Sequence, residues 1–123
     1  MIIRDGKQLT ELMDLVHDHW FNLETVALDP KSRSVVLYVE PRRSALAQGS
    51  CRGITLTVKN VEDLTVKDTE HVRDYDINEI TFDPTTRTIV LTGGIPIEIV
   101  LRVSALEIDA SSRADPTAAQ HPS

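Results

Sequence analysis

The chain has 123 residues, enough for one domain of ordinary size. Hydrophobic residues make up 41% and charged residues 26%, the balance of a globular protein. The 13 lysine and arginine residues stand against 19 aspartate and glutamate residues and leave a net charge of −6. This charge argues against general nucleic-acid binding, because phosphate binding draws on a positive field, and it permits a basic protein partner.

Cysteine content and hydropathy exclude further classes. Cys51 is the only cysteine, so neither an intrachain disulfide nor a thiolate zinc cluster can form. No apolar run approaches the roughly 20 residues that span a bilayer, and the N-terminal residues show no cleavage-type signal. We therefore expect a cytoplasmic protein that does not act at a membrane.

The first predicted element is a helix over residues 7–18. Apolar residues recur there at spacings of three and four, which places them on one face of a helix. Asp5 precedes the pattern and is a suitable residue to begin the helix. The apolar stripe consists of Leu9, Leu12, Met13, Val16 and Trp20.

From residue 20 the apolar period changes to two, which is typical of half-buried strands. Strands are expected at residues 26–28, 35–39, 54–58, 64–66, 80–82, 89–91, 97–103 and 106–108. Asp29-Pro30 and Asp83-Pro84 favour tight turns, and Gly93-Gly94 favours another. We predict a mainly β fold over residues 1–110, with about eight antiparallel strands in a sandwich or barrel and the helix packed on it. Residues 111–123 are expected to form a disordered tail.

The sequence also resembles itself. An offset of 54 places residues 23–37 on residues 77–91 with five identities, and it places Phe21 on Tyr75 and His17 on His71. Later strands correspond at an offset of 43 (Ile54 with Ile97) and then 42 (Leu64 with Leu106). One interpretation is two copies of a four-strand unit. The other is that Asp-Pro hairpins look alike because turn chemistry offers few choices.

The densest polar cluster suggests a metal site as one hypothesis. His17 and His19 flank Asp18, and His71 could join them if the repeat brings it near; histidine and aspartate are common ligands of transition metals. The competing interpretation is that these residues end a helix and face water.

Two charged segments are candidate partner-binding surfaces. Residues 59–83 carry eight carboxylates and three basic residues, so they offer a surface to a basic partner. The candidates there are Glu62, Asp63, Asp68 and Glu70. The connection over residues 40–52 is longer than a turn requires and carries Arg42 and Arg43 as alternative candidates.

The segment from His17 to Glu24, followed by the Asp29-Pro30 hairpin, resembles small bacterial β-rich proteins of unassigned function. Some of these are grouped with contact-dependent toxin immunity proteins, which carry a His-Asp-x-x-Phe-type opening before their first strand. The resemblance covers this short stretch and implies a stoichiometric protein-binding role, without assigning a functional residue. We therefore expect a non-enzymatic binding or accessory domain with no cofactor, and homo-oligomers stay open. The alternative is a metal-dependent enzyme that uses His17, His19 or His71.

Overall fold

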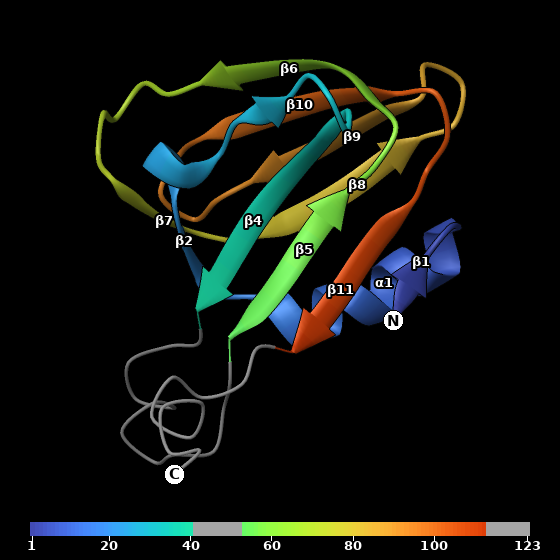
Figure 1. Cartoon of the computed structure of the whole chain (residues 1–123). Coiled ribbons are helices and arrows are strands. Elements are labelled where there is room, and N and C mark those ends of the chain that lie inside the picture. The colour runs from blue at the N-terminus through green and yellow to red at the C-terminus, as the bar shows by residue number, and fades with distance from the viewer. Residues whose placement is uncertain (41–52, 113–123) are drawn as a thin grey trace, which may run out of the picture.

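The computed structural model describes residues 1–40 and 53–112, which form two antiparallel sheets and one α-helix (Figure 1). The larger sheet has the order β1 (Ile2–Ile3), β11 (Ile108–Ser112), β5 (Ile54–Val58), β4 (Ser34–Glu40), β2 (Trp20–Asn22) and β7 (Asp74–Asp76), with β3 (Leu28–Asp29) paired to β4. The smaller sheet has the order β6 (Val61–Lys67), β10 (Glu98–Val103), β9 (Thr88–Thr92) and β8 (Glu79–Asp83). The predicted mainly β sandwich is confirmed, and the described strands do not close into a barrel.

The core lies between the two layers and is built from valine, isoleucine and leucine, with two aromatic rings. Figure 1 shows β4, β5 and β11 lying across the layer of β6, β10, β9 and β8. Strand residues alternate between buried and exposed, as the period of two predicts: in β4 the buried residues are Val35, Leu37 and Val39. Phe21 and Tyr75 add stacked rings whose centroids are 6.3 Å apart.

The helix α1 (Gly6–Val16) starts where the sequence suggests and ends earlier. Asp5 caps it, since its Oδ1 accepts a hydrogen bond from the Gln8 backbone N–H at 2.8 Å. Leu9, Leu12 and Val16 are buried, and Met13 Sδ accepts a bond from the Ile80 backbone N–H at 3.1 Å, so the helix packs on β8.

The expectation that Trp20 continues the apolar face of the helix is wrong. The helix stops at Val16, and Asp18 adopts a left-handed φ of 65°. The Asp18 backbone N–H donates to the Ile77 carbonyl at 2.8 Å instead of continuing the helical ladder. Trp20 therefore begins strand β2, where its side chain is 37% exposed.

Six of the eight predicted strands match observed strands, while the first and the last are displaced: β3 and β11 share only Leu28 and Ile108 with the predicted residues 26–28 and 106–108. Three short strands join these eight. These additions, β1, β2 and β7, are two or three residues long, too short for a period of two to reveal them. Residues 23–25 form a short 3₁₀ helix, η1 (Leu23–Thr25). The last strand continues to Ser112, two residues beyond the predicted end of the domain, and the rest of the predicted tail lies outside the described residues.

The two halves of the chain use matching strand pairings. In the larger sheet Val35 lies opposite Val58, and in the smaller sheet Ile89 lies opposite Leu101, at the offsets of 54 and 43 found in the sequence. Each half also contributes one strand to the other half's sheet: β11 pairs with β5, and β6 pairs with β10.

Two hydrogen bonds continue this correspondence. The Val61 N–H donates to the Arg33 carbonyl at 2.8 Å, and the Val103 N–H donates to the Arg87 carbonyl at 2.9 Å. Arg33 and Arg87 have positive φ angles of 52° and 54°. Beyond this point the predicted offset of 42 is out of register for both remaining pairs, Leu64 with Leu106 and Val66 with Ile108, because Leu64 pairs with Leu101 and Ile108 pairs with Val58. Leu64 therefore corresponds to Ile108 and not to Leu106.

Candidate functional site

The histidines of the predicted metal site each make local contacts. His17 caps the end of α1 and its Nδ1 lies 3.2 Å from Asp18 Oδ2, while His19 Nδ1 lies 3.3 Å from the His17 carbonyl oxygen. His71 follows β6, with its Nδ1 4.0 Å from Asp68 Oδ2.

The fold does not bring His71 to His17. His17 lies three positions before the start of β2, and His71 lies three positions before the start of β7. The two strands pair antiparallel, with Phe21 opposite Tyr75. The starts of antiparallel strands lie at opposite ends of the pair, so the two histidines are separated. Over residues 1–40 and 53–112, no group of three or more histidine, cysteine, aspartate or glutamate side chains is placed to hold a metal ion.

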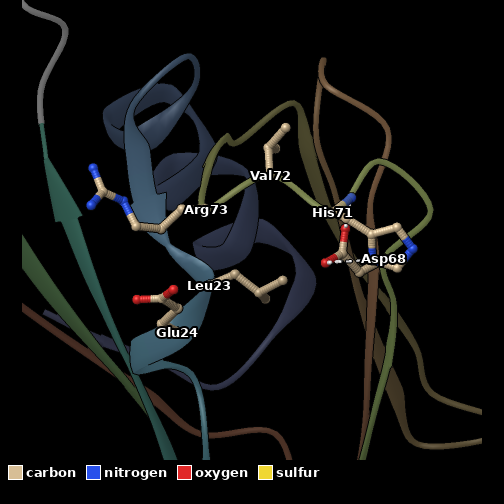
Figure 2. Close-up of a pocket in the computed structure, with 6 residues that line it drawn as sticks. All are labelled: Leu23, Glu24, Asp68, His71, Val72 and Arg73. Carbon is tan, nitrogen blue, oxygen red and sulfur yellow. Dashed lines mark hydrogen bonds and ion pairs between the residues drawn. The ribbon is translucent and has the colours of Figure 1, made fainter.

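A pocket of about 440 Å³ opens beside the end of β6. Figure 2 shows Glu24 and Arg73 on one side of it and Asp68 and His71 on the other, with Leu23 pointing across it. Val72 completes the lining. The Leu23 backbone N–H donates to the Arg73 carbonyl at 2.9 Å, which ties η1 to the loop before β7.

Asp68 holds this loop together. Its Oδ1 accepts a hydrogen bond from the Tyr75 hydroxyl and another, at 3.0 Å, from the His71 backbone N–H. The Tyr75 hydrogen bond is the main reason that the pKa of Asp68 lies below its usual value. Burial, and then the bond to Asp68, raise the pKa of the Tyr75 hydroxyl. Both shifts favour an ionised carboxylate bonded to a neutral phenol, which is a structural contact.

Removing this contact gives a pH-dependent loss of stability. We expect Tyr75→Phe to lower the Tm by about 5 °C at neutral pH, since a charge-assisted hydrogen bond is lost. A lowered aspartate pKa stabilises the fold above the ordinary value of 3.8, and that contribution disappears as the pH falls through the lowered pKa. The difference in Tm between wild type and variant should therefore shrink well below pH 3.8 in thermal melts followed by circular dichroism.

A double-mutant cycle controls for this assignment. Asp68→Asn should cost a similar amount, and the double variant should be little worse than either single variant. Additive losses would show that Asp68 and Tyr75 stabilise the fold independently. So would a Tm difference between wild type and Tyr75→Phe that is the same at neutral pH and well below pH 3.8.

The eight carboxylates of residues 59–83 do not form one surface. Glu62 and Asp63 lie on β6, whereas Glu79 and Asp83 lie on β8, at the opposite edge of the smaller sheet. Several others have structural roles: Asp68 binds Tyr75, and Asp74 pairs with Arg73 at 3.2 Å. Asp76 accepts from the Ile95 N–H at 2.8 Å, and Asp83 accepts from the Thr85 N–H at 2.9 Å.

The carboxylates of Glu62, Asp63 and Glu70 are different. All three residues are exposed, and within residues 1–40 and 53–112 their side chains make no hydrogen bond or ion pair. Lys67, the basic residue at the end of β6, is already 3.4 Å from Glu98. The first half of β6 therefore carries two exposed carboxylates that form no ion pair within the described residues, with Arg102 of β10 opposite Asp63.

Strand β6 is also an edge strand, which sequence reasoning missed. Among the described strands it pairs only with β10, and six of its seven residues are exposed or partly exposed, including Val66 at 37%. Figure 1 shows it running along one margin of the molecule. On its outer edge the Val61 N–H is bonded to the Arg33 carbonyl, and no described strand pairs there with the backbone from Leu64 to Val66, so that part of the edge can accept an added strand. The other predicted partner-binding residues, Arg42 and Arg43, lie outside the described residues, as does Cys51.

Comparison with protein-family models, with curated proteins and with solved structures finds no match to this chain. No helix among the described residues is long and apolar enough to cross a membrane.

Proposed function

We propose that the chain is a non-enzymatic binding domain that receives a basic segment of another protein on the carboxylates of β6 and the following loop. The observation that carries this proposal is the charge on the edge strand: Glu62 and Asp63 are exposed and unpaired within the described part of the chain. Glu70 adds a further exposed carboxylate in the loop beyond the other end of β6. Such charge attracts basic segments and speeds their association.

The resemblance of residues 17–24 to small bacterial β-rich proteins, some of them grouped with toxin immunity proteins, supports the same class of function. An immunity-like protein would bind its partner in a stoichiometric complex and would need no catalytic group. A cytoplasmic location belongs to this proposal and is supported by the single cysteine, Cys51.

We also propose that the two halves arose as copies of one four-strand unit. The equal pairing of Val35 with Val58 and of Ile89 with Leu101 supports this interpretation. So do the hydrogen bonds that join Val61 to Arg33 and Val103 to Arg87. Similar turn chemistry alone would explain like hairpins, but it would not explain the exchange of β6 and β11 between the sheets.

A titration with a basic peptide tests the binding proposal. The probe is a fluorescein-labelled peptide of repeated Arg-Val, and binding is followed by fluorescence anisotropy. We expect binding that weakens between low and physiological salt, because charge attraction is screened. Neutralising three carboxylates together (Glu62→Gln, Asp63→Asn, Glu70→Gln) should weaken it about tenfold at low salt. Asp68 is left intact because it holds the loop.

A matched variant separates local charge from net charge. Glu11→Gln, Asp14→Asn and Glu79→Gln remove the same number of charges from exposed positions on α1 and β8. This variant should bind the peptide as the wild type does. Equal weakening in both triple variants would mean that only net charge matters and would contradict the proposed surface.

A further inference from the structure

The edges of the two sheets correspond, and one of them is already occupied. Ile108 of β11 lies opposite Val58, and Leu64 of β6 lies opposite Leu101. Since Val58 and Leu101 are equivalent at the offset of 43, the outer edge of β6 corresponds to the outer edge of β11. In the larger sheet β1 covers that edge, whereas no described strand covers it on β6.

The contact of β1 with β11 shows which backbone groups face an added strand. Met1 and Ala110 exchange hydrogen bonds, Met1 N to Ala110 O at 3.0 Å and Ala110 N to Met1 O at 2.8 Å. In an antiparallel pair of strands, hydrogen-bonded residue pairs alternate with non-hydrogen-bonded pairs. After Met1 and Ala110, the next hydrogen-bonded pair is therefore Ile3 and Ile108. The corresponding outward-facing groups on β6 are those of Val66 and Leu64.

The side chains of this contact show what an added strand would carry. Ile3, opposite Ile108, is fully buried. The next residue, Arg4, places its Nε 3.4 Å from Glu107 Oε1, and Lys59 Nζ lies 3.3 Å from Glu107 Oε2. The carboxylate of Glu107 thus lies between two cations: Lys59, which follows the neighbouring strand β5, and Arg4, which follows the edge strand β1.

The smaller sheet has the same residue types at two of these three positions. Asp63 takes the position of Glu107, and Arg102, opposite Asp63, takes the position of Lys59. Within the described chain no residue takes the position of Arg4. Asp63, with Glu62 beside it, is therefore placed to meet a basic side chain on an incoming strand.

We propose that the β6 edge binds an extended segment of a partner protein by antiparallel strand addition, with an apolar residue opposite Leu64 and a basic residue directly after it opposite Asp63. This proposal rests on the proposed function and specifies its geometry. Main-chain hydrogen bonds to Leu64 and Val66 supply part of the affinity, and the alternating apolar and basic side chains supply specificity. A second copy of this chain is the poorer occupant, because each copy carries a net charge of −6.

Backbone methylation of the Arg-Val peptide tests the geometry directly. By analogy with Ile3, the valine N–H groups face β6 and the arginine N–H groups face away. N-methylation of the valine amides should weaken binding to the wild-type protein by at least about tenfold. N-methylation of the arginine amides, which adds the same number of methyl groups and keeps every charge, should leave binding within about twofold.

A substitution on the protein tests the same edge. Val66→Pro removes an outward N–H, which an edge strand tolerates, and should weaken binding of the unmethylated peptide about tenfold. Val66→Thr keeps the N–H and should bind as the wild type does. Urea unfolding reports whether the proline variant is folded. If it is not, the binding of the methylated peptides to the wild-type protein decides whether a strand is added to β6.

The outcomes separate the two proposals. If the carboxylate triple variant binds weakly while valine methylation and Val66→Pro have no effect, the basic-segment function stands and strand addition is wrong. If none of these changes weakens binding, both proposals fail, and the charges of β6 only keep the edge from pairing. A wild-type dimer that Val66→Pro dissociates would assign the edge to a second copy and overturn the proposed occupant.

Discussion

Replacing Phe21 with alanine is expected to lower the free energy of unfolding by about 3–5 kcal/mol, the usual cost of truncating a buried phenylalanine. Phe21 is 1% exposed, and its strand β2 joins the two halves of the chain. It lies opposite Val39 on one side and Tyr75 on the other, and its ring stacks on Tyr75. Because small domains are stable by only about 5–15 kcal/mol, urea unfolding should show a midpoint far below that of the wild type.

The neighbouring tryptophan provides the control. Trp20 is the larger side chain, but it is 37% exposed on the other face of β2. Trp20→Ala should cost about 1 kcal/mol or less. If the two variants lost equal stability, the contact of Phe21 with Tyr75 would not be the joint between the halves.

The strands β4, β5, β8, β9 and β10 could be predicted because their residues alternate between buried and more exposed positions. Val35, Leu37 and Val39 show the period of two without reference to any partner. Turn chemistry then places the hairpins: the Asp29 and Asp83 carboxylates accept backbone N–H groups two residues on, at 2.9 Å in both turns. These are local interactions, and a single sequence contains them.

The end of the helix could not be predicted in this way. The spacing of apolar residues continues from Val16 to Trp20, and no proline or glycine interrupts it. What ends the helix is a distant hydrogen bond from Asp18 to the carbonyl of Ile77. A periodic pattern carries no information about such a partner, so the expected apolar stripe ran one turn too far.

The candidate site was predicted in part for the same reason. Charge density singled out Glu62 and Asp63, because a run of carboxylates is visible in the sequence. That Asp68 has a structural role depends on Tyr75, and that β6 is an edge depends on the order of strands in the sheet. The separation of His17 from His71 likewise follows from the antiparallel pairing of β2 with β7. Neighbours in space decide each of these points.

Leu12→Ala should remove about 2–5 kcal/mol from the free energy of unfolding. Leu12 is fully buried at the centre of α1, between Leu9 and Val16 on the face that packs on β8 and the core. Alanine is the strongest helix former, so the substitution does not weaken the helix itself. The loss therefore measures packing of the helix on the sheets, read from urea unfolding with circular dichroism.

Leu15 makes the comparison internal to the same helix. It is 51% exposed, so Leu15→Ala removes the same atoms from a position that faces solvent. We expect its free energy of unfolding to stay within about 0.5 kcal/mol of the wild type. Equal, small effects of both substitutions would mean that α1 forms without closing the core. A large loss for Leu12 alone would show that the helix completes the sandwich, since only a packed side chain leaves a cavity when it is shortened.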